Sequence, residues 1–218
     1  MDTKKKNIAV FASGSGTNFE AIVTACRNGT IAGADVALLV CDHHDAFAVE
    51  RAKRLGIKYF IFDRKAYDSK EEYETAVLEV LKPYHIDLIC LAGYMRIVGQ
   101  TLLEAYPKRI LNIHPALLPS FKGATAIIDA FEYGVKVFGV TVHLIDNTVD
   151  GGVIISQRAF EYEGDSSGIR PRRLGAPQPV EQPDAEGRQH EVGRCSLIIT
   201  VGQSSQPGQR IKIGRAHV

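Results

Sequence analysis

The chain has 218 residues, of which 45% are hydrophobic and 23% are charged, a composition typical of a folded globular protein. Its 26 Lys and Arg residues nearly balance its 25 Asp and Glu residues, which predicts no general attraction to nucleic acid or to a membrane surface. No apolar run approaches the roughly 20 residues of a membrane span, and the four cysteines lack the CxxC spacing of a zinc site.

Residues 7–113 alternate short apolar runs with segments of helical spacing. The predicted strands are 7–12, 35–40, 58–62, 86–93 and 109–113, and the predicted helices are 19–29, 45–56 and 69–83. Short apolar strands that alternate with helices are typical of a parallel sheet covered on both faces. Two extended segments around the turn NTVDGG predict an antiparallel edge near residues 138–162. We therefore expect an α/β fold with an open, mostly parallel sheet and helices on both faces.

The sequence changes character after residue 163. No Phe or Tyr follows Tyr162, arginine replaces lysine as the main basic residue, and five of the nine prolines lie between Pro171 and Pro207. Within this part of the chain, only residues 196–201 have the pattern of a strand. We interpret residues 1–163 as one domain and residues 164–218 as an unrelated tail of low order, the product of a lost reading frame; a natural disordered tail is the alternative.

The turn SGSGTN at residues 13–18 follows the first predicted strand and precedes a helix. Its glycines free backbone N–H groups at a helix N-terminus, where the helix dipole favours an anion such as phosphate. Thr17 and Asn18 can add side-chain bonds and cap the helix. The turn is neither a P-loop nor a complete dinucleotide motif, because Phe19 stands where the third glycine would be. A simple helix-capping turn is the alternative interpretation.

The segment NIHPALLPSFKG, residues 112–123, combines polar groups with rigid backbone. Pro115 and Pro119 restrict their own φ and the residues before them, which pre-organises a loop beyond a strand end. Asn112 offers an amide donor and His114 can carry a proton near neutral pH. The pair suits stabilisation of a tetrahedral oxyanion in acyl transfer. A structural histidine that caps a turn is the alternative.

Four other polar residues have simpler explanations when taken alone. Asp150, in the turn TVDGG, would favour the protonated form of His114 if the fold brought them together, but Asp-Gly is also an ordinary hairpin turn. His43 and His44 invite a metal interpretation, although consecutive residues point in different directions and a solvated loop fits better. His143 alternates with apolar neighbours and is assigned no role.

Four motifs, in their order and spacing, resemble phosphoribosylglycinamide formyltransferase, a folate-dependent family of purine biosynthesis. They are SGSGTN, AGYMRIV (92–98), NIHPALLPSFKG and VDGG, within residues 6–163. The resemblance implies a Rossmann-like formyltransferase fold and a cytoplasmic enzyme, monomeric or homodimeric. It implies transfer of a formyl group from 10-formyltetrahydrofolate, a co-substrate, to the amine of glycinamide ribonucleotide, without a metal.

The resemblance also assigns residues to three roles. The catalytic residues would be Asn112, His114 and Asp150. The residues that bind the substrate phosphate would be Gly16, Thr17 and Asn18. The residues that bind folate would be Lys70, Met95, Arg96, Ile97, Val98 and Asn112.

Two departures and three rival interpretations accompany the resemblance. Thr125 stands where the family commonly has a histidine, and nothing after residue 164 matches the closing helix of the family. The rivals are formyltetrahydrofolate hydrolase, methionyl-tRNA formyltransferase, and an inactive truncated chain that binds folate or nucleotide without turnover. The hydrolase usually carries an extra domain before the catalytic one, and the arginine-rich tail lacks the aromatic residues that stack on RNA.

Overall fold

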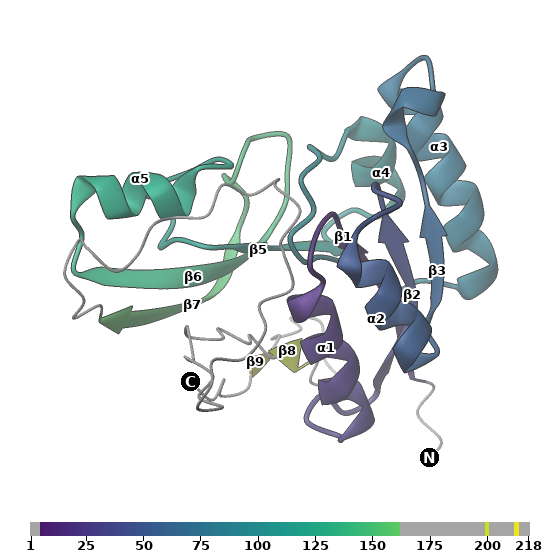
Figure 1. Ribbon diagram of the computed structural model, residues 1–218, viewed down its shortest axis with the longest axis horizontal. Coiled ribbons are helices and arrows are strands. Elements are labelled where there is room, and N and C mark those ends of the chain that lie inside the picture. Colours follow the sequence, from purple (N-terminus) through teal and green to yellow (C-terminus); the bar gives the residue numbers. More distant parts are fainter. Residues whose placement is uncertain (1–4, 162–198, 201–211, 214–218) are drawn as a thin grey trace, which may run out of the picture.

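The protein is built on a seven-stranded sheet with the order β3-β2-β1-β4-β5-β6-β7 (Figure 1). The computed structural model describes residues 5–161, 199–200 and 212–213. The first five strands are parallel, whereas β6 is antiparallel to β5 and β7 is antiparallel to β6. The strands are β1 (Lys6–Ala12), β2 (Ala34–Cys41), β3 (Lys58–Ile61), β4 (Leu88–Leu91), β5 (Ile110–His114), β6 (Val137–Leu144) and β7 (Ile154–Glu161). Two short strands, β8 (Ile199–Thr200) and β9 (Lys212–Ile213), form a separate antiparallel pair.

Helices cover both faces of the parallel part of the sheet. One face carries α1 (Thr17–Arg27) and α2 (Phe47–Leu55), and the other carries α3 (Lys70–Leu81) and α4 (Gln100–Ala105). A fifth helix, α5 (Ala126–Tyr133), runs beside β6 and β7 (Figure 1). Two short 3-10 helices, η1 (Arg64–Ala66) and η2 (Lys82–Tyr84), flank α3. The predicted fold class, including its antiparallel edge, is confirmed.

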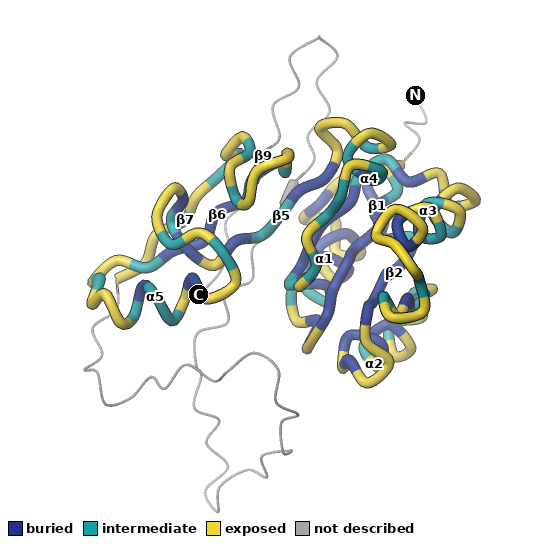
Figure 2. The backbone as a smooth tube through the Cα atoms, turned by 90° about the horizontal axis from the view of Figure 1, so that it is seen from above, coloured by how far each residue is buried: buried dark blue, intermediate teal, exposed yellow. Residues whose placement is uncertain are grey.

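The central strand β1 shows why its apolar run is continuous. Ile8 and Val10 pack in the cluster of α1 and α2, whereas Ala9 and Phe11 pack in the cluster of α3. All four are buried, and Figure 2 shows the strands of the parallel sheet as the buried centre of the molecule. Burial of a side chain as large as Phe11 stabilises the fold by about 1.5–3 kcal/mol. A strand covered on both faces therefore has no polar alternation, as the sequence indicated.

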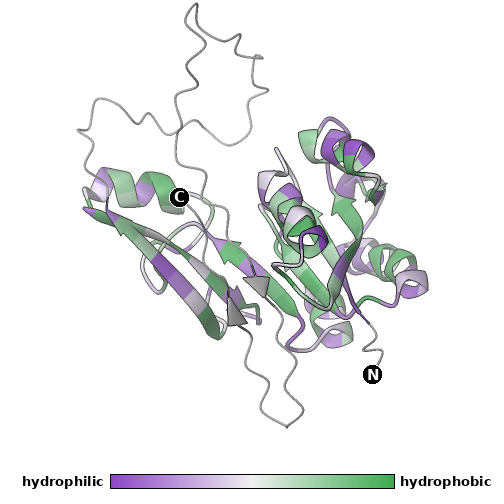
Figure 3. Ribbon diagram, turned by 90° about the horizontal axis from the view of Figure 1, so that it is seen from below, coloured by the Kyte–Doolittle hydropathy of each residue, from purple (hydrophilic) through white to green (hydrophobic). Residues whose placement is uncertain are grey.

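The helices, in contrast, show one apolar and one polar side (Figure 3). In α1, Phe19, Ile22 and Val23 are buried against the sheet, while the last turn ends on the exposed Arg27. Spacing of three and four residues places such apolar positions on one side of a helix. Within the described residues, no helix is both long enough and apolar enough to span a bilayer.

The structure corrects several predicted elements. It contains α4 and α5, which the sequence analysis did not predict, and it shortens the predicted strand 86–93 to β4. The N-terminus of α1 is capped by Gly16, with no side-chain hydrogen bond from Thr17 or Asn18. The predicted tail from residue 164 lies outside the described residues apart from β8 and β9, so the domain boundary stays a prediction.

Candidate active site

The predicted site residues gather at the carboxyl edge of the parallel sheet. The turn 13–18 follows β1, the segment 92–98 follows β4, and the loop from residue 115 follows β5. Because β1, β4 and β5 are neighbouring parallel strands, these three segments emerge at the same edge. The chain also changes direction here, since β2 lies on one side of β1 and β4 on the other. Ligands of open α/β sheets bind at such a switch point.

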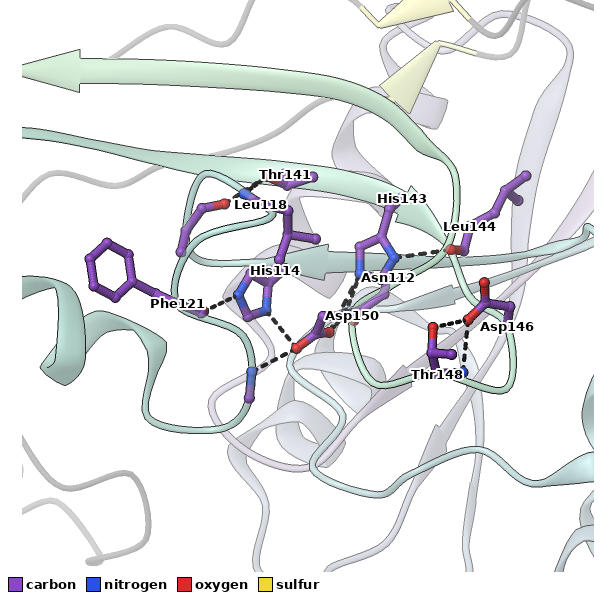
Figure 4. Close-up of polar contacts among 12 residues, drawn as sticks. Asn112, His114, Leu118, Phe121, Thr141, His143, Leu144, Asp146, Thr148 and Asp150 are labelled. Carbon is purple, nitrogen blue, oxygen red and sulfur yellow. Dashed lines mark hydrogen bonds and ion pairs between the residues drawn. The ribbon is translucent and has the colours of Figure 1, made fainter.

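Asn112, His114 and Asp150 come together at this edge (Figure 4). Asn112 and His114 belong to β5, and Asp150 lies in the turn between β6 and β7. Nδ1 of His114 is 3.4 Å from Oδ2 of Asp150, and Nδ2 of Asn112 is 3.5 Å from Oδ1. Two donors therefore face one carboxylate. Both distances are at the long end of the hydrogen-bond range, so both donors are loosely engaged.

The imidazole of His114 is held in one orientation. Its Nε2 lies 2.8 Å from the carbonyl oxygen of Phe121, and the residue is only 3% exposed. A carbonyl oxygen only accepts, so Nε2 carries a proton. Asp150 supplies a second acceptor at Nδ1. An acceptor therefore lies near each ring nitrogen, so a hydrogen on either nitrogen has a partner in the site.

The proline-containing loop after β5 is anchored to the neighbouring strand and to the site. The hydroxyl of Thr141, on β6, accepts from the N–H of Leu118 at 3.1 Å and donates to the carbonyl oxygen of Ala116 at 2.6 Å. The loop then returns so that the N–H of Gly123 donates to Oδ2 of Asp150 at 2.8 Å. Asp150 itself has a φ of 49°, a left-handed conformation that Asp tolerates better than most residues. These bonds fix the carboxylate beside His114.

Behind Asn112 lies His143, which is 1% exposed and pairs with Asn112 across β5 and β6. Its Nε2 is 3.1 Å from Nδ2 of Asn112 and 3.6 Å from Oδ1 of Asp150. Burial lowers the pKa of His143 below its ordinary value, and it outweighs the opposing effects of the Leu144 carbonyl and Asp150. The ring of His143 is therefore neutral at neutral pH.

The turn 13–18 has the tight backbone expected of an anion cradle. Gly16 has a φ of 72°, and a Cβ added there would lie 2.6 Å from Cα of Ala48, so only glycine fits. Nε of Arg51 donates to the carbonyl oxygen of Ser15 at 2.8 Å, which ties the turn to α2. The first backbone N–H groups of α1 have no partner within the helix. They are available to an anion, and the roles of Thr17 and Asn18 stay predictions.

The segment Met95 to Val98 is fixed by side chains from other elements. Oγ of Ser13, in the turn after β1, accepts from the N–H of Met95 at 2.8 Å. Nε of Arg96 donates at 2.6 Å to Oδ2 of Asp42, whose side chain is fully buried. The carboxylate of Glu74, on α3, accepts from the N–H of Gly99. The segment is thus fastened at both ends and in the middle.

The apolar side chains of this segment face outward. Met95 is 52% exposed and Ile97 is 72% exposed. Lys70 is the first residue of α3, and its side chain lies beside Gly99, the residue that follows the segment. A Cβ added to Gly99 would be 2.7 Å from Cε of Lys70. An open cleft of about 370 Å³ adjoins Lys70 and Gly99 between α3 and α4. The structure therefore brings Lys70 to the predicted folate-binding segment.

Two positions singled out in the sequence have other surroundings. Thr125 directly precedes α5, and its hydroxyl donates to Asp129 at 2.9 Å. His43 lies 3.6 Å from Oδ2 of Asp42. Among the residues that the structure describes, no group of three or more His, Cys, Asp and Glu is placed to hold a metal ion.

Four further residues support the site without having been assigned a role from the sequence: Ser13, Asp42, Glu74 and His143. One signal was present for two of them, because Ser13 and Asp42 directly follow parallel strands, β1 and β2, at the edge where ligands bind. Glu74 gave no signal, since an acidic residue in an amphipathic helix is ordinarily exposed. His143 was assigned no role from the sequence, because its contact with Asn112 depends on strand register.

Comparison with known proteins defines the class of this fold and site. The formyl transferase family matches residues 6–167, and the chain belongs to this family. Its fold class and enzyme class are those predicted from the sequence.

The relatives specify the branch of the family. The phosphoribosylglycinamide formyltransferase of Bacillus subtilis (strain 168) is 50% identical over 158 residues, which span 72% of this chain and 80% of that protein. That of Haemophilus influenzae is 40% identical over 194 residues, spanning 89% of this chain and 85% of that protein. The crystal structure of phosphoribosylglycinamide formyltransferase from Bacillus halodurans is 51% identical, with a TM-score of 0.70 over 72% of this chain and 81% of that chain. The resemblance drawn from the sequence motifs is confirmed.

Proposed function

We propose that this enzyme transfers the formyl group of 10-formyltetrahydrofolate to the amine of glycinamide ribonucleotide, in the cytoplasm, as a step of de novo purine biosynthesis. The observation that carries the proposal is the convergence of Asn112, His114 and Asp150 at the carboxyl edge of the sheet. The family membership and the names of the relatives support the same substrates.

The reaction begins when the ribonucleotide amine attacks the formyl carbon. The carbonyl π electrons move to the formyl oxygen, which becomes an oxyanion. Nδ2–H of Asn112 and Nδ1–H of His114 both face Asp150, so an oxygen that enters between them receives both hydrogen bonds. Removal of one such donor typically slows a reaction by a factor of about 100 to 1,000.

Asp150 serves the proton transfers. Its carboxylate lies against His114 and is fixed by the N–H of Gly123. It stabilises the imidazolium and accepts the proton that the attacking nitrogen loses. The carbonyl then re-forms as the bond between the formyl carbon and N10 of the folate breaks, and N10 takes the proton held by Asp150, which returns to the carboxylate form. The products are formylated ribonucleotide and tetrahydrofolate.

The neighbouring segments provide the two substrate sites. The turn 13–18 would receive the phosphate, because Gly16 exposes backbone N–H groups at the start of α1. The segment 95–98 would receive the pterin, because its backbone is fixed while Met95 and Ile97 offer exposed apolar surface. Lys70 would pair with a carboxylate of the folate. In this arrangement the two substrates meet beside Asn112 and His114.

A transfer assay with competing acceptors tests the proposal. The purified chain is given 10-formyltetrahydrofolate with glycinamide ribonucleotide, with methionyl-tRNA, or with water alone, and each formylated product and free formate are quantified. We expect formylated glycinamide ribonucleotide as the main product. Formate without an acceptor would instead indicate a hydrolase. Binding of both substrates by calorimetry without any turnover would indicate an inactive remnant and contradict the proposal.

A further inference from the structure

His143 contacts two of the three proposed catalytic residues but has no assigned role. It lies on β6 directly opposite Asn112 of β5, and it is among the largest fully buried side chains of the described residues. Figure 4 shows its ring between Leu144, on one side, and Asn112 with Asp150, on the other. A buried imidazole at this position needs partners for both nitrogens.

The partners determine the tautomer of His143. Nδ1 lies 2.9 Å from the carbonyl oxygen of Leu144, which can only accept, so Nδ1 carries the proton. In the neutral ring Nε2 is then an acceptor, and it lies 3.1 Å from Nδ2 of Asn112. Burial lowers the pKa of His143, while the Leu144 carbonyl, Asp150 and Asp146 oppose this effect and His114 adds to it. The neutral tautomer therefore prevails at neutral pH.

The orientation of the Asn112 amide decides whether it can stabilise an oxyanion. The two ends of a primary amide have nearly the same shape but opposite polarity, so only hydrogen bonds distinguish the two orientations. With its NH₂ group toward the formyl oxygen, Asn112 stabilises the developing negative charge. With its carbonyl oxygen there, it would repel that charge.

We propose that His143 is a positioning residue that fixes the amide of Asn112 with its NH₂ group toward the reacting formyl oxygen. The Nε2 lone pair accepts one N–H, which leaves the second N–H directed toward Asp150 at 3.5 Å. That longer contact is the one that an incoming oxygen replaces. The bond to His143 lies behind the site and persists while the substrate is bound. This inference rests on the proposed formyl transfer.

A double-mutant cycle separates this role from a merely structural one. His143→Leu removes the acceptor and keeps an apolar side chain in the buried site, whereas His143→Gln restores an acceptor near the place of Nε2. We expect His143→Leu to lower kcat by about 10- to 100-fold with little change in either KM, because Asn112 acts on the transition state. We expect His143→Gln to recover most of this loss.

The same substitutions in the Asn112→Ala background provide the decisive comparison. If His143 acts through Asn112, His143→Leu changes kcat by less than about twofold once that amide is absent. A full 10- to 100-fold loss in this background would overturn the proposal, and so would wild-type kcat for His143→Leu alone.

A measurement on the wild-type protein keeps the proposal testable if a variant fails to fold. In a ¹⁵N spectrum at pH 7.5, Nε2 of His143 should give the signal of an unprotonated nitrogen and Nδ1 that of a protonated one. The reverse assignment would overturn the proposal. Failure of the wild-type enzyme to formylate glycinamide ribonucleotide would contradict the proposed function and leave the tautomer measurement as the separate test of this inference.

Discussion

Nδ1 of His114 lies 3.4 Å from Oδ2 of Asp150, although the two residues belong to different elements of the fold. His114 ends the parallel strand β5, while Asp150 lies in the turn of the antiparallel β6–β7 pair. The site therefore forms where the parallel sheet meets its antiparallel edge. A shift in the register of the β5–β6 or the β6–β7 pairing would separate the carboxylate of Asp150 from the imidazole of His114.

We first predict that Asp150→Asn lowers kcat about 100-fold or more, because it removes both the partner of the imidazolium and the proton acceptor. The substitution keeps the size of the side chain, so stability and substrate affinity should change little. Asp146→Asn is the matched control, since Asp146 is an exposed carboxylate of the same turn that bonds to Thr148. Equal steady-state losses in the two variants would contradict the assigned role.

Gly16→Ala should damage the phosphate turn. Its added Cβ would lie 2.6 Å from Cα of Ala48, and the φ of 72° disfavours any L side chain. We expect a loss of about 2–4 kcal/mol in the free energy of unfolding, measured with urea, and weaker binding of the ribonucleotide. Gly14→Ala should stay close to wild type, because no atom lies within 4 Å of its Cβ position. A stable Gly16→Ala protein with normal affinity would refute this account of the turn.

Arg96→Met should destabilise the protein by leaving the buried carboxylate of Asp42 without its charged partner. Asp42 Oδ2 accepts from Nε of Arg96, while Oδ1 has no hydrogen-bond partner among the described residues. Because the guanidinium is partly exposed, we expect a loss of about 2–4 kcal/mol on urea unfolding. The double variant Asp42→Leu, Arg96→Met should recover part of this loss. No recovery would show that the ion pair is not the cause.

The same pair predicts a kinetic effect. Since Arg96 lies in the segment 95–98, Arg96→Met should raise the KM for 10-formyltetrahydrofolate more than the KM for glycinamide ribonucleotide. The comparison is made at saturating concentrations of the other substrate. A larger change in the ribonucleotide KM would place the folate elsewhere.

Acidification should selectively reduce the stability that depends on His143. The pKa of His143 in the folded state lies below the ordinary value of 6.5. Above pH 6.5 its imidazole is neutral in both the folded and the unfolded protein, so its contribution to the free energy of unfolding is fully present. As the pH falls below 6.5, the unfolded state binds a proton that the folded state does not. Below pH 6.5, the free energy of unfolding of wild type should fall more steeply than that of His143→Gln, by up to about 1.4 kcal/mol per pH unit. Urea unfolding at several pH values measures this, and parallel curves would disprove it.

Local pattern was sufficient for much of the fold. The strand β1 and the helix α3 were predicted because a continuous apolar run and a helical spacing are visible within a few residues. The helix α4 was not, because it has six residues and its N-terminus is capped by Glu74 of another helix. The capping role expected of Thr17 and Asn18 was wrong, because Gly16, in a left-handed conformation, occupies the N-cap position before α1.

The site was predictable to a smaller extent. Asn112 and His114 drew attention because they lie one residue apart before a proline-braced loop. Asp150 was assigned through the resemblance of its motif to a family, since Asp-Gly alone predicts a turn. His143 could not be assigned, because its contact with Asn112 arises from the pairing of β5 with β6. Contacts across strands depend on register, which a single sequence does not display.

The central claim is that this chain forms formylated glycinamide ribonucleotide through Asn112, His114 and Asp150. The most direct test is the rate of that reaction for wild type and His114→Ala, with thermal shift measured for each substrate on both proteins. We predict transfer by wild type and a loss of at least about 100-fold in His114→Ala, with the binding of both substrates retained. Intact binding together with an unchanged rate in His114→Ala would contradict the account.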